Sequence, residues 1–343
     1  MLYRGDRNML NFAILGAGAM GGAHTNGLAS IENDKVKYIA VCDIDEEKAK
    51  AFAAEHGIPK VYTDINDMLK DGEIDVVDLC LPSHMHEKFG IMVCEAKKHL
   101  LVEKPIAFEV EPAKRIYDAA KKNGVRIMTA QVLRFWPEYK KIKEMYDEGV
   151  FGTVRHIYAA RLGQLPDWGG GWYADPAKSG ETMLNLTLHD IDFLHYMLGK
   201  PVSVYSAGVR DETGCYNDIM NVFKWESGVN AIVDGSLSMT PSYPFTMRFR
   251  IAGSKATAEF TYIAGVNIGP DSTSDLILYR PGEEPEKLNV PQIDGYGSEV
   301  LYFADCIEKG ADTELMSEES ILIVLNSIMK AKESLADNKV KEL

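Results

Sequence analysis

The 343-residue chain has few cysteines, no long apolar run and a deficit of positive charge. Its five cysteines form no C-x-x-C pair, which argues against a disulfide framework or a zinc site and favours reduced thiols. No stretch approaches the roughly 20 apolar residues that span a bilayer. The 51 acidic and 37 basic residues give a net charge of −14, which disfavours nucleic acid and anionic membranes as partners. We therefore expect a soluble cytoplasmic protein.

The first part of the chain alternates short apolar runs with helical segments. Apolar runs without polar interruption are typical of parallel strands that helices cover on both faces. The expected strands are 12–15, 36–41, 76–79, 100–102 and 125–128, and the expected helices include 45–56 and 110–122. This pattern predicts a doubly wound α/β domain, a Rossmann domain, over residues 1–130. The apolar segment 9–23 fits its first strand and turn better than a signal peptide.

The rest of the chain has a different pattern, with longer strand-like runs separated by turns. Helices are expected at 137–148, 182–198, 298–309 and 317–336, and strands at 202–209, 219–225, 229–237, 245–251, 257–262 and 276–279. This pattern predicts an α+β domain over residues 131–343, built on an open, mostly antiparallel sheet, for substrate binding and oligomerisation. We expect its C-terminal helices, from about residue 296, to pack back on the first domain.

A glycine motif stands between the first expected strand and a helix that begins near Ala19. Gly16 permits a tight turn, Gly18 lets the backbone approach a pyrophosphate, and Gly21 allows close packing of helix on strand. The helix N-terminus attracts the anion. The motif alone is weak evidence, but its position between strand and helix is the one that dinucleotide binding requires. We expect this turn, with Ala19 and Met20, to bind the cofactor.

Asp43 ends the next expected strand, about 20 residues after Gly21. A carboxylate there accepts a hydrogen bond from a free ribose 2′-hydroxyl and repels a 2′-phosphate. Neither residue 44 nor residue 45 is an arginine that could bind such a phosphate. Asp43 could also favour the N-terminus of the helix that follows. We therefore expect NAD rather than NADP.

Lys104 and a polar stripe on the expected helix 182–198 are two further candidates for binding or catalysis. Lys104 follows the fifth expected strand, where ligands of open α/β sheets bind, and its ammonium can stabilise a developing alkoxide. The alternative is a surface charge. Asn185, His189 and Asp192 share one face of the expected helix 182–198, which is otherwise apolar. Such a stripe binds a hydroxylated substrate if it faces a crevice, and is otherwise the solvated face of the helix.

Several motifs together resemble the glucose–fructose oxidoreductase/inositol dehydrogenase (Gfo/Idh/MocA) family, over nearly the whole chain. These are the glycine motif with His24, the segments 40–43 and 80–86, the E-K-P triplet 103–105, the L-R-F-W-P segment 133–137 and the segment 179–192. The resemblance implies an NAD(P)-dependent oxidoreductase that acts on sugars, cyclitols or related polyols. It also implies a second-domain sheet that often packs on a partner subunit, so we expect a homodimer or homotetramer.

The resemblance also implies roles for particular residues. His189 matches the histidine that accepts the substrate hydroxyl proton, a task that suits imidazole. Asn185 stands where the family usually has aspartate, and its amide can orient a partner but cannot stabilise an imidazolium. We expect Lys104, Asn185 and His189 to be catalytic and to contact substrate. The other expected cofactor contacts are Leu81, Pro82, His86 and Glu103, and the other expected substrate contacts are Arg134 and Trp172.

Two local features allow more than one interpretation. The aromatic loop 167–173 is either a substrate lid or packing at a subunit contact, and Arg134 either edges the same pocket or packs structurally. His84 and His86 have no second cluster of ligands at metal-binding spacing, so we expect no metal. Their place after the fourth strand favours a helix start and a cofactor contact.

The leading hypothesis is an NAD-dependent oxidoreductase that transfers a hydride between a secondary alcohol of a sugar, cyclitol or polyol and nicotinamide. One alternative is a redox-neutral glycosidase or lyase that retains its NAD and acts through a transient 3-keto sugar. Another is a non-catalytic sensor that binds a dinucleotide and a partner protein, against which Lys104 and His189 argue.

Overall fold

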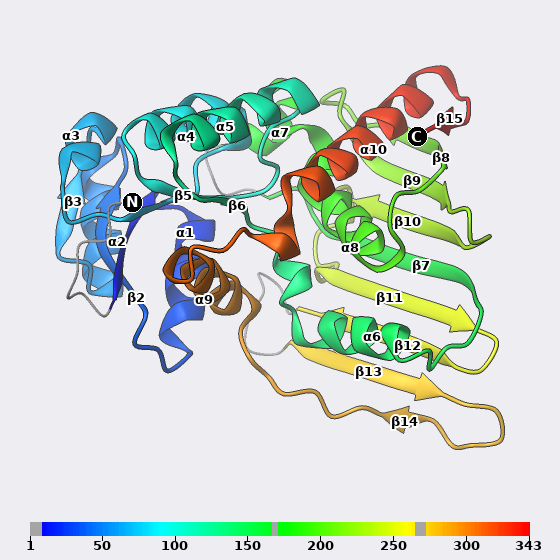
Figure 1. Ribbon diagram of the computed structural model, residues 1–343. Coiled ribbons are helices and arrows are strands. Elements are labelled where there is room, and N and C mark those ends of the chain that lie inside the picture. Colours follow the sequence, from blue (N-terminus) through cyan, green and yellow to red (C-terminus); the bar gives the residue numbers. More distant parts are fainter. Residues whose placement is uncertain (1–8, 167–170, 265–271) are drawn as a thin grey trace. The chain divides into compact units, whose positions relative to one another are not determined.

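The computed structural model describes residues 9–166, 171–264 and 272–343, and the chain divides into two compact units (Figure 1). Unit 1 comprises the chain up to Phe135 together with Ile293–Glu319, and unit 2 comprises Trp136–Gln292 and Ser320–Leu343. Residues 167–170 of the predicted aromatic loop lie outside the described residues. In the described part of the chain, no helix is both long enough and apolar enough to cross a membrane.

Unit 1 contains a six-stranded parallel sheet in the order β3-β2-β1-β4-β5-β6, which confirms the predicted Rossmann fold. The strands are β1 (Leu10–Leu15), β2 (Val36–Cys42), β3 (Lys60–Tyr62), β4 (Val76–Leu79), β5 (His99–Val102) and β6 (Ile127–Thr129). The sequence pattern missed only β3, a three-residue edge strand whose side chains are exposed or half-buried. The other strands are largely buried, so helices cover both faces of the sheet, as uninterrupted apolar runs predict.

Helices from two distant parts of the chain complete unit 1. They are α1 (Ala19–Ala29), α2 (Glu46–His56), α3 (Ile65–Lys70), α4 (His86–Glu95), α5 (Val110–Asn123) and α9 (Gly295–Glu308), with short turns η1 (Ser83–Met85), η2 (Val132–Arg134) and η5 (Glu314–Met316). Helix α9 packs closely on α1, because a Cβ atom at Gly297 would lie 2.3 Å from the carbonyl oxygen of Gly27. The two glycines therefore let a C-terminal helix contact the first helix of the dinucleotide fold.

Unit 2 contains a nine-stranded sheet in the order β14-β13-β12-β11-β7-β10-β9-β8-β15. Its strands are β7 (Val154–Leu162), β8 (Ser203–Arg210), β9 (Tyr216–Lys224), β10 (Asn230–Ser236), β11 (Thr246–Gly253), β12 (Thr257–Ile263), β13 (Thr273–Tyr279), β14 (Glu286–Lys287) and β15 (Lys341–Glu342). All neighbours pair antiparallel except β7 and β10, which are parallel. The predicted mostly antiparallel sheet is confirmed, although the sequence pattern missed its central strand, β7.

Helices cover one face of the unit 2 sheet. These are α6 (Pro137–Asp147), α8 (Leu188–Leu198) and α10 (Glu318–Asp337), which lie along the same side of the strands in Figure 1, and a short α7 (Pro176–Ser179) precedes α8. Side chains that alternate with the buried ones, such as Met220 and Ile232, are exposed. The sheet therefore has one face packed under helices and one face open in the single chain.

The expected helix 182–198 is divided into two parts. Met183–Thr187 form a π-helix, and the regular α-helix α8 begins only at Leu188. The π-helix packs against β10 at Gly235, where a Cβ atom would lie 2.2 Å from Cγ2 of Thr187. Gly235 therefore permits the wide turn of the π-helix to approach the sheet just before His189.

Replacing Gly235 with alanine should destabilise unit 2, because the added methyl group would overlap the Thr187 side chain. Overpacking of this kind costs about 1–3 kcal/mol, and we expect that loss in the free energy of unfolding measured with urea. The matched control is Gly72→Ala, because a Cβ atom at Gly72 would meet no described atom within 4 Å. Equal stability of the two variants would contradict the close packing at Gly235.

Candidate active site

The three glycines of the turn after β1 each meet a distinct steric requirement. Gly16 has a φ of +108°, and a Cβ atom there would lie 2.8 Å from the carbonyl oxygen of Cys80. A Cβ atom at Gly21 would lie 2.8 Å from the carbonyl oxygen of Gly16, so the helix packs directly on the strand end. At Gly18 a Cβ atom would meet no described atom within 4 Å, so the backbone is open to a ligand.

The N-terminus of α1 fits an anionic group. Gly18 is the N-cap residue and supplies no side-chain hydrogen bond, and the first turn contains no acidic residue. The first amides of a helix have no intrahelical acceptor and attract an anion. With Ala19 exposed and Met20 half-buried, this turn can receive a pyrophosphate. The residues therefore fit a dinucleotide.

Asp43 lies at the end of β2 beside this turn. Its Oδ2 atom accepts hydrogen bonds from the backbone amide of Ala17, at 3.0 Å, and from Nζ of Lys48, at 3.1 Å. Its Oδ1 atom accepts from the amide of Asp45, at 3.1 Å. Asp45, and not Asp43, is the N-cap of α2, because its side chain accepts from the Lys48 amide. Asp43 therefore holds the backbone of the glycine turn through the Ala17 amide. Its exposed fraction is 9 %.

Lys104 is held at the carboxyl end of β5 through its neighbour Glu103. The Lys104 backbone amide donates a hydrogen bond to Oε2 of Glu103 at 2.9 Å. The other Glu103 oxygen lies 3.0 Å from Nε2 of His24, a fully buried residue of α1. Glu103 is itself buried, whereas Lys104 is only half-buried. Both Glu103 oxygens are therefore engaged inside the protein, which argues against the direct cofactor contact predicted for Glu103, whereas Lys104 is partly exposed after the carboxyl end of β5.

The segment after β4 contains the fully buried His86 and the half-buried Leu81 and Pro82. His86 is fully buried, and its ring nitrogens lie 2.8 Å and 2.7 Å from the carbonyl oxygens of Pro105 and Leu81. Burial lowers its pKa. His86 therefore joins the loop after β4 to the loop after β5, and this burial argues against a direct cofactor contact. Leu81 and Pro82 are half-buried, and Cδ2 of Leu81 would lie 3.1 Å from a Cβ atom at Gly16.

Arg134 has a structural partner in unit 1. It is 3 % exposed and donates a hydrogen bond from a guanidinium nitrogen to the carbonyl oxygen of Leu315. This contact favours structural packing, the second of the two interpretations that the sequence allowed, over a substrate contact.

The predicted polar stripe of unit 2 is mostly buried. Asn185 lies in the π-helix, is 8 % exposed and donates a hydrogen bond from Nδ2 to the carbonyl oxygen of Glu181 at 3.1 Å. Asp192 is fully buried, whereas His189 is half-buried in the first turn of α8. The stripe is therefore not a solvated helix face.

Sequence reasoning missed the ion pair beside His189. Oδ2 of the fully buried Asp190 accepts a hydrogen bond from Nε of Arg161 on β7, at 3.1 Å. Burial raises the pKa of Asp190, and the Arg161 guanidinium opposes that rise. The sequence signal for this ion pair is that Arg161 and Asp190 each stand next to apolar residues. The ion pair fixes the start of α8 on the central strand.

Trp172 lies in the short helix η3 (Trp172–Ala174) of unit 2 and is half-buried. Its ring stacks on Tyr173, with centroids 3.9 Å apart and planes 29° apart. The pair therefore presents partly exposed aromatic surface, which sugar C–H groups and a second subunit can both use.

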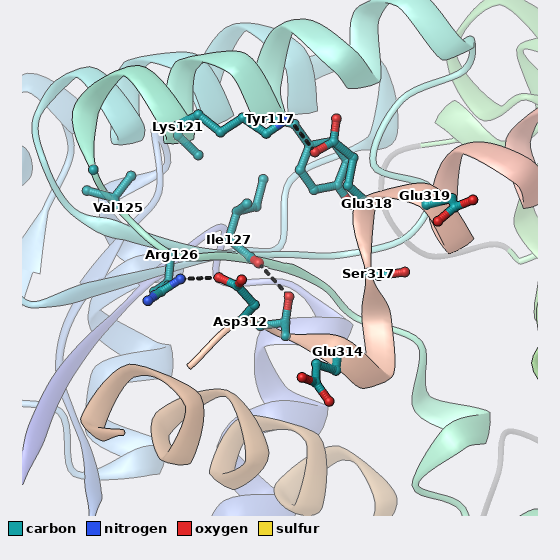
Figure 2. Close-up of a pocket in the computed structure, with 13 residues that line it drawn as sticks. Tyr117, Lys121, Val125, Arg126, Ile127, Asp312, Glu314, Ser317, Glu318 and Glu319 are labelled. Atoms are coloured by element: carbon teal, nitrogen blue, oxygen red, sulfur yellow. Dashed lines mark hydrogen bonds and ion pairs between the residues drawn. The ribbon is translucent and has the colours of Figure 1, made fainter. Parts of the chain in front are cut away.

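The cleft shown in Figure 2 is separate from the predicted site residues. It has a volume of about 740 Å³ and lies in unit 1 between α5, the start of β6 and the segment 312–319. The ion pairs Arg126–Asp312 and Lys121–Glu318 join its walls. None of the residues predicted to bind cofactor or substrate lines this cleft.

Comparison with known proteins identifies the family. Residues 10–131 match the model described as the oxidoreductase family with an NAD-binding Rossmann fold, and residues 139–259 match the GFO/IDH/MocA C-terminal domain. The chain belongs to the Gfo/Idh/MocA family of oxidoreductases. One match lies in each unit, and together they confirm the resemblance.

Individual relatives agree with this assignment. An uncharacterized oxidoreductase, YrbE, from Bacillus subtilis (strain 168) is 28% identical, over 90% of this chain and 89% of its own. Myo-inositol 2-dehydrogenase from Thermotoga maritima is 27% identical, over 72% of this chain and 73% of its own. Aldose-aldose oxidoreductase from Caulobacter crescentus, crystallised with glycerol, has the same fold, with a TM-score of 0.85, 20% identity and coverage of 98% and 100% of the two chains.

Replacing Asp43 with alanine should weaken NAD binding more than NADP binding. The change removes an acceptor for the ribose 2′-hydroxyl, which raises the NAD dissociation constant roughly 10-fold or more, and it removes a charge that repels a 2′-phosphate. Titration of both cofactors measures the two constants. Lys48→Met is the matched control, because it removes the Asp43 ion pair but keeps the carboxylate, and it should preserve NAD affinity. A wild-type preference for NADP would contradict the assignment.

Proposed function

We propose that this protein is an NAD-dependent oxidoreductase that transfers a hydride between a secondary alcohol of a sugar, cyclitol or polyol and nicotinamide. The observation that carries the proposal is that unit 1 contains both a glycine turn, where no side chain caps the N-terminus of α1, and Lys104, whose backbone is held after β5 by Glu103. All five cysteines are unpaired, in keeping with the cytoplasmic location that we also propose.

The proposed cofactor contacts follow from the turn. The backbone of Gly18 and the first amides of α1 bind the pyrophosphate, and Asp43 accepts from a ribose hydroxyl. Leu81 and Pro82 supply half-buried apolar surface next to Gly16. Nicotinamide supplies the hydride acceptor or donor when the dinucleotide is bound.

The proposed catalytic roles use two cationic or titratable side chains. Lys104 stabilises the negative charge that develops on the substrate oxygen, and His189 accepts the hydroxyl proton during oxidation. Asn185 orients a substrate hydroxyl or the His189 ring, because its amide donates and accepts hydrogen bonds without carrying charge. The Asp190–Arg161 ion pair fixes the helix turn from which His189 projects.

Two observations support a carbohydrate-like substrate. The relative from Thermotoga maritima is a myo-inositol 2-dehydrogenase, which acts on a cyclitol. The stacked Trp172–Tyr173 pair offers an aromatic face that can cover the C–H surface of such a ring.

Lys104→Met and His189→Asn should each lower kcat far more than they change the NAD dissociation constant. Loss of a positioned acid–base or charge-stabilising group costs on the order of 10²–10⁴ in rate, because the interaction is made mainly in the transition state. Steady-state kinetics with a panel of inositols, hexoses and polyols, together with an NAD titration, measures both effects. Near-wild-type kcat in both variants would overturn the site.

Asn185 favours one alternative, a redox-neutral glycosidase or lyase that retains NAD. The amide replaces the aspartate that the family usually has, and its Nδ2 atom is engaged with the Glu181 carbonyl oxygen. Absorbance at 340 nm with a glycoside panel separates the two functions. Net NADH formation supports the dehydrogenase, whereas product release without net NADH supports the alternative.

We also propose that the open face of the unit 2 sheet is a homodimer or homotetramer interface. It exposes Val209, Met220 and Ile232 on three neighbouring strands. An exposed apolar face of this kind commonly marks an interface.

Light scattering at micromolar concentration should therefore give two or four times the mass of one chain. Met220→Lys together with Ile232→Lys should shift the protein toward monomer without unfolding it, because neither side chain is buried in the single chain. The matched control is Ile44→Lys, an exposed apolar residue of unit 1. A monomeric wild type would contradict the proposed interface.

A further inference from the structure

A buried histidine joins four elements of unit 1. The ring of His24, on α1, is fully buried, and its Nδ1 atom lies 2.8 Å from Oδ2 of Asp78 on β4. Its Nε2 atom lies 3.0 Å from Oε1 of Glu103, after β5, and 3.5 Å from Oε1 of Glu299 on α9. Since carboxylates face both ring nitrogens, both nitrogens donate and the ring is an imidazolium. Its pKa is raised, because the Asp78 and Cys80 contacts outweigh the opposing effect of burial.

A proton on one carboxyl group halves the buried net negative charge of this cluster. Asp78, Glu103 and Glu299 are all at least 95 % buried around the single imidazolium. Three ionised carboxylates would leave a buried net charge of −2, which is very costly. Asp78 accepts from Tyr38 at 2.7 Å and Glu103 from the Lys104 amide at 2.9 Å.

Glu299 is the carboxyl group of this cluster whose charged form has the weakest support. Among the described residues, neither of its buried carboxyl oxygens has a partner of full hydrogen-bond geometry, and Nε2 of His24 lies 3.5 Å from Oε1. Burial raises its pKa well above the usual value, Glu103 and Asp78 add to the rise, and His24 and the backbone amide of Gln131 oppose it. The other titratable groups that face the cluster are Tyr38 and Cys80, whose pKa values burial also raises.

Glu103 connects this cluster to the proposed catalytic lysine. One carboxylate oxygen contacts His24 and the other accepts from the backbone amide of Lys104. A displacement of the imidazole or of the Glu103 carboxylate would therefore move the backbone from which the Lys104 ammonium extends.

We propose that His24, Glu103 and a protonated Glu299 form a buried network that positions Lys104, with His24 and Glu103 as positioning residues for the reaction. This inference rests on the proposed function for its effect on the rate. The network itself is tested separately, by a measurement of stability that requires no activity.

The first experiment tests the proton on Glu299. An unfolded glutamate has a pKa near 4.3, and the folded pKa is higher. Between these values the folded protein binds one more proton than the unfolded chain, so the Glu299 contribution to stability falls as the pH rises from about 4.3. Glu299→Gln keeps the shape without a titratable proton and therefore lacks this fall.

The expected result is a difference in melting temperature, Glu299→Gln minus wild type, that increases from pH 5 to pH 8. His24, Tyr38 and Cys80 are present in both proteins, so the difference between them reports on residue 299 and its coupling to these neighbours. The matched control is Glu138→Gln, because Glu138 is also buried but accepts hydrogen bonds from Ser274 and Gln292. That variant should lose stability without an increase of this sign. A flat or decreasing difference for Glu299→Gln would overturn the protonated network.

The second experiment is a double-mutant cycle with Glu103→Gln and Lys104→Met. Misplacement of a reacting group by about 1 Å can cost on the order of 10² in rate, so Glu103→Gln should lower kcat by roughly that factor while NAD affinity changes little. In the Lys104→Met background the same change should alter the residual kcat less than about 3-fold, because Glu103 acts through Lys104. Equal rate losses in both backgrounds would show a purely structural Glu103.

Three further outcomes distinguish a failure of this inference from a failure of the proposed function. Should Glu103→Gln fail to fold, Glu103→Asp preserves the charge and replaces it in the cycle, with a shortened reach to Lys104. A wild-type kcat in Lys104→Met would refute the proposed function but leave the stability result standing. A bound metal ion, detected by elemental analysis of the wild type and lost in Glu299→Gln, would overturn the network, because a metal ion would then occupy the place of the proton.

Discussion

The positive charge of the buried His24 imidazole constrains the whole core of unit 1. An unpaired charge in this environment would cost several kcal/mol or more, so carboxylates must reach it from fixed positions. Asp78 does so from β4, and Glu103 does so from the end of β5. The pairing fixes α1 relative to two neighbouring strands. Helix α9 adds Glu299 and the Tyr296 ring, 5.9 Å from the imidazole, and so closes the cluster with a segment from the far end of the chain.

The same constraint explains how the dinucleotide turn can contain three glycines among the six residues 16–21. Glycine turns have little intrinsic order, because glycine loses more conformational entropy on folding than any other residue. Here Gly16 is confined by the Cys80 carbonyl, and Gly21 by the carbonyl of Gly16. His24 anchors α1 one turn further on, so the exposed amides of Gly18 and Ala19 lie at the end of a fixed helix. The flexible residues are thereby held in place from both sides.

Local sequence patterns predicted every strand of the unit 1 sheet except β3, and most of unit 2. Uninterrupted apolar runs marked β1, β2, β4, β5 and β6, because both faces of these strands are buried. Strand β7 escaped, since Arg155, His156 and Arg161 interrupt its apolar pattern. Two of those residues are exposed, whereas Arg161 is buried because Asp190 neutralises it. The neutralising Asp190 lies 29 positions away in the chain, on α8, so the local pattern around β7 does not contain it.

The candidate site shows the same limit. Spacing identified the glycines, Asp43 and Lys104, because each has a fixed position relative to a strand end. It did not identify the partners that connect distant segments, such as His24 with Asp78, 54 positions apart. Nor did it separate the π-helix from α8, since a polar stripe at helical spacing fits both.

Each proposed catalytic side chain is the immediate neighbour of a buried ion pair. Glu103 precedes Lys104 and pairs with His24, while Asp190 follows His189 and pairs with Arg161. A polar side chain at the end of an apolar element is poorly placed by hydrophobic packing, because packing is non-directional. A hydrogen-bonded ion pair is directional, and once buried it cannot shift without exposing an uncompensated charge. Glu103 and Asp190 are thus fixed inside the protein, and the peptide bond transmits that position to the neighbouring residue for which we propose a catalytic role.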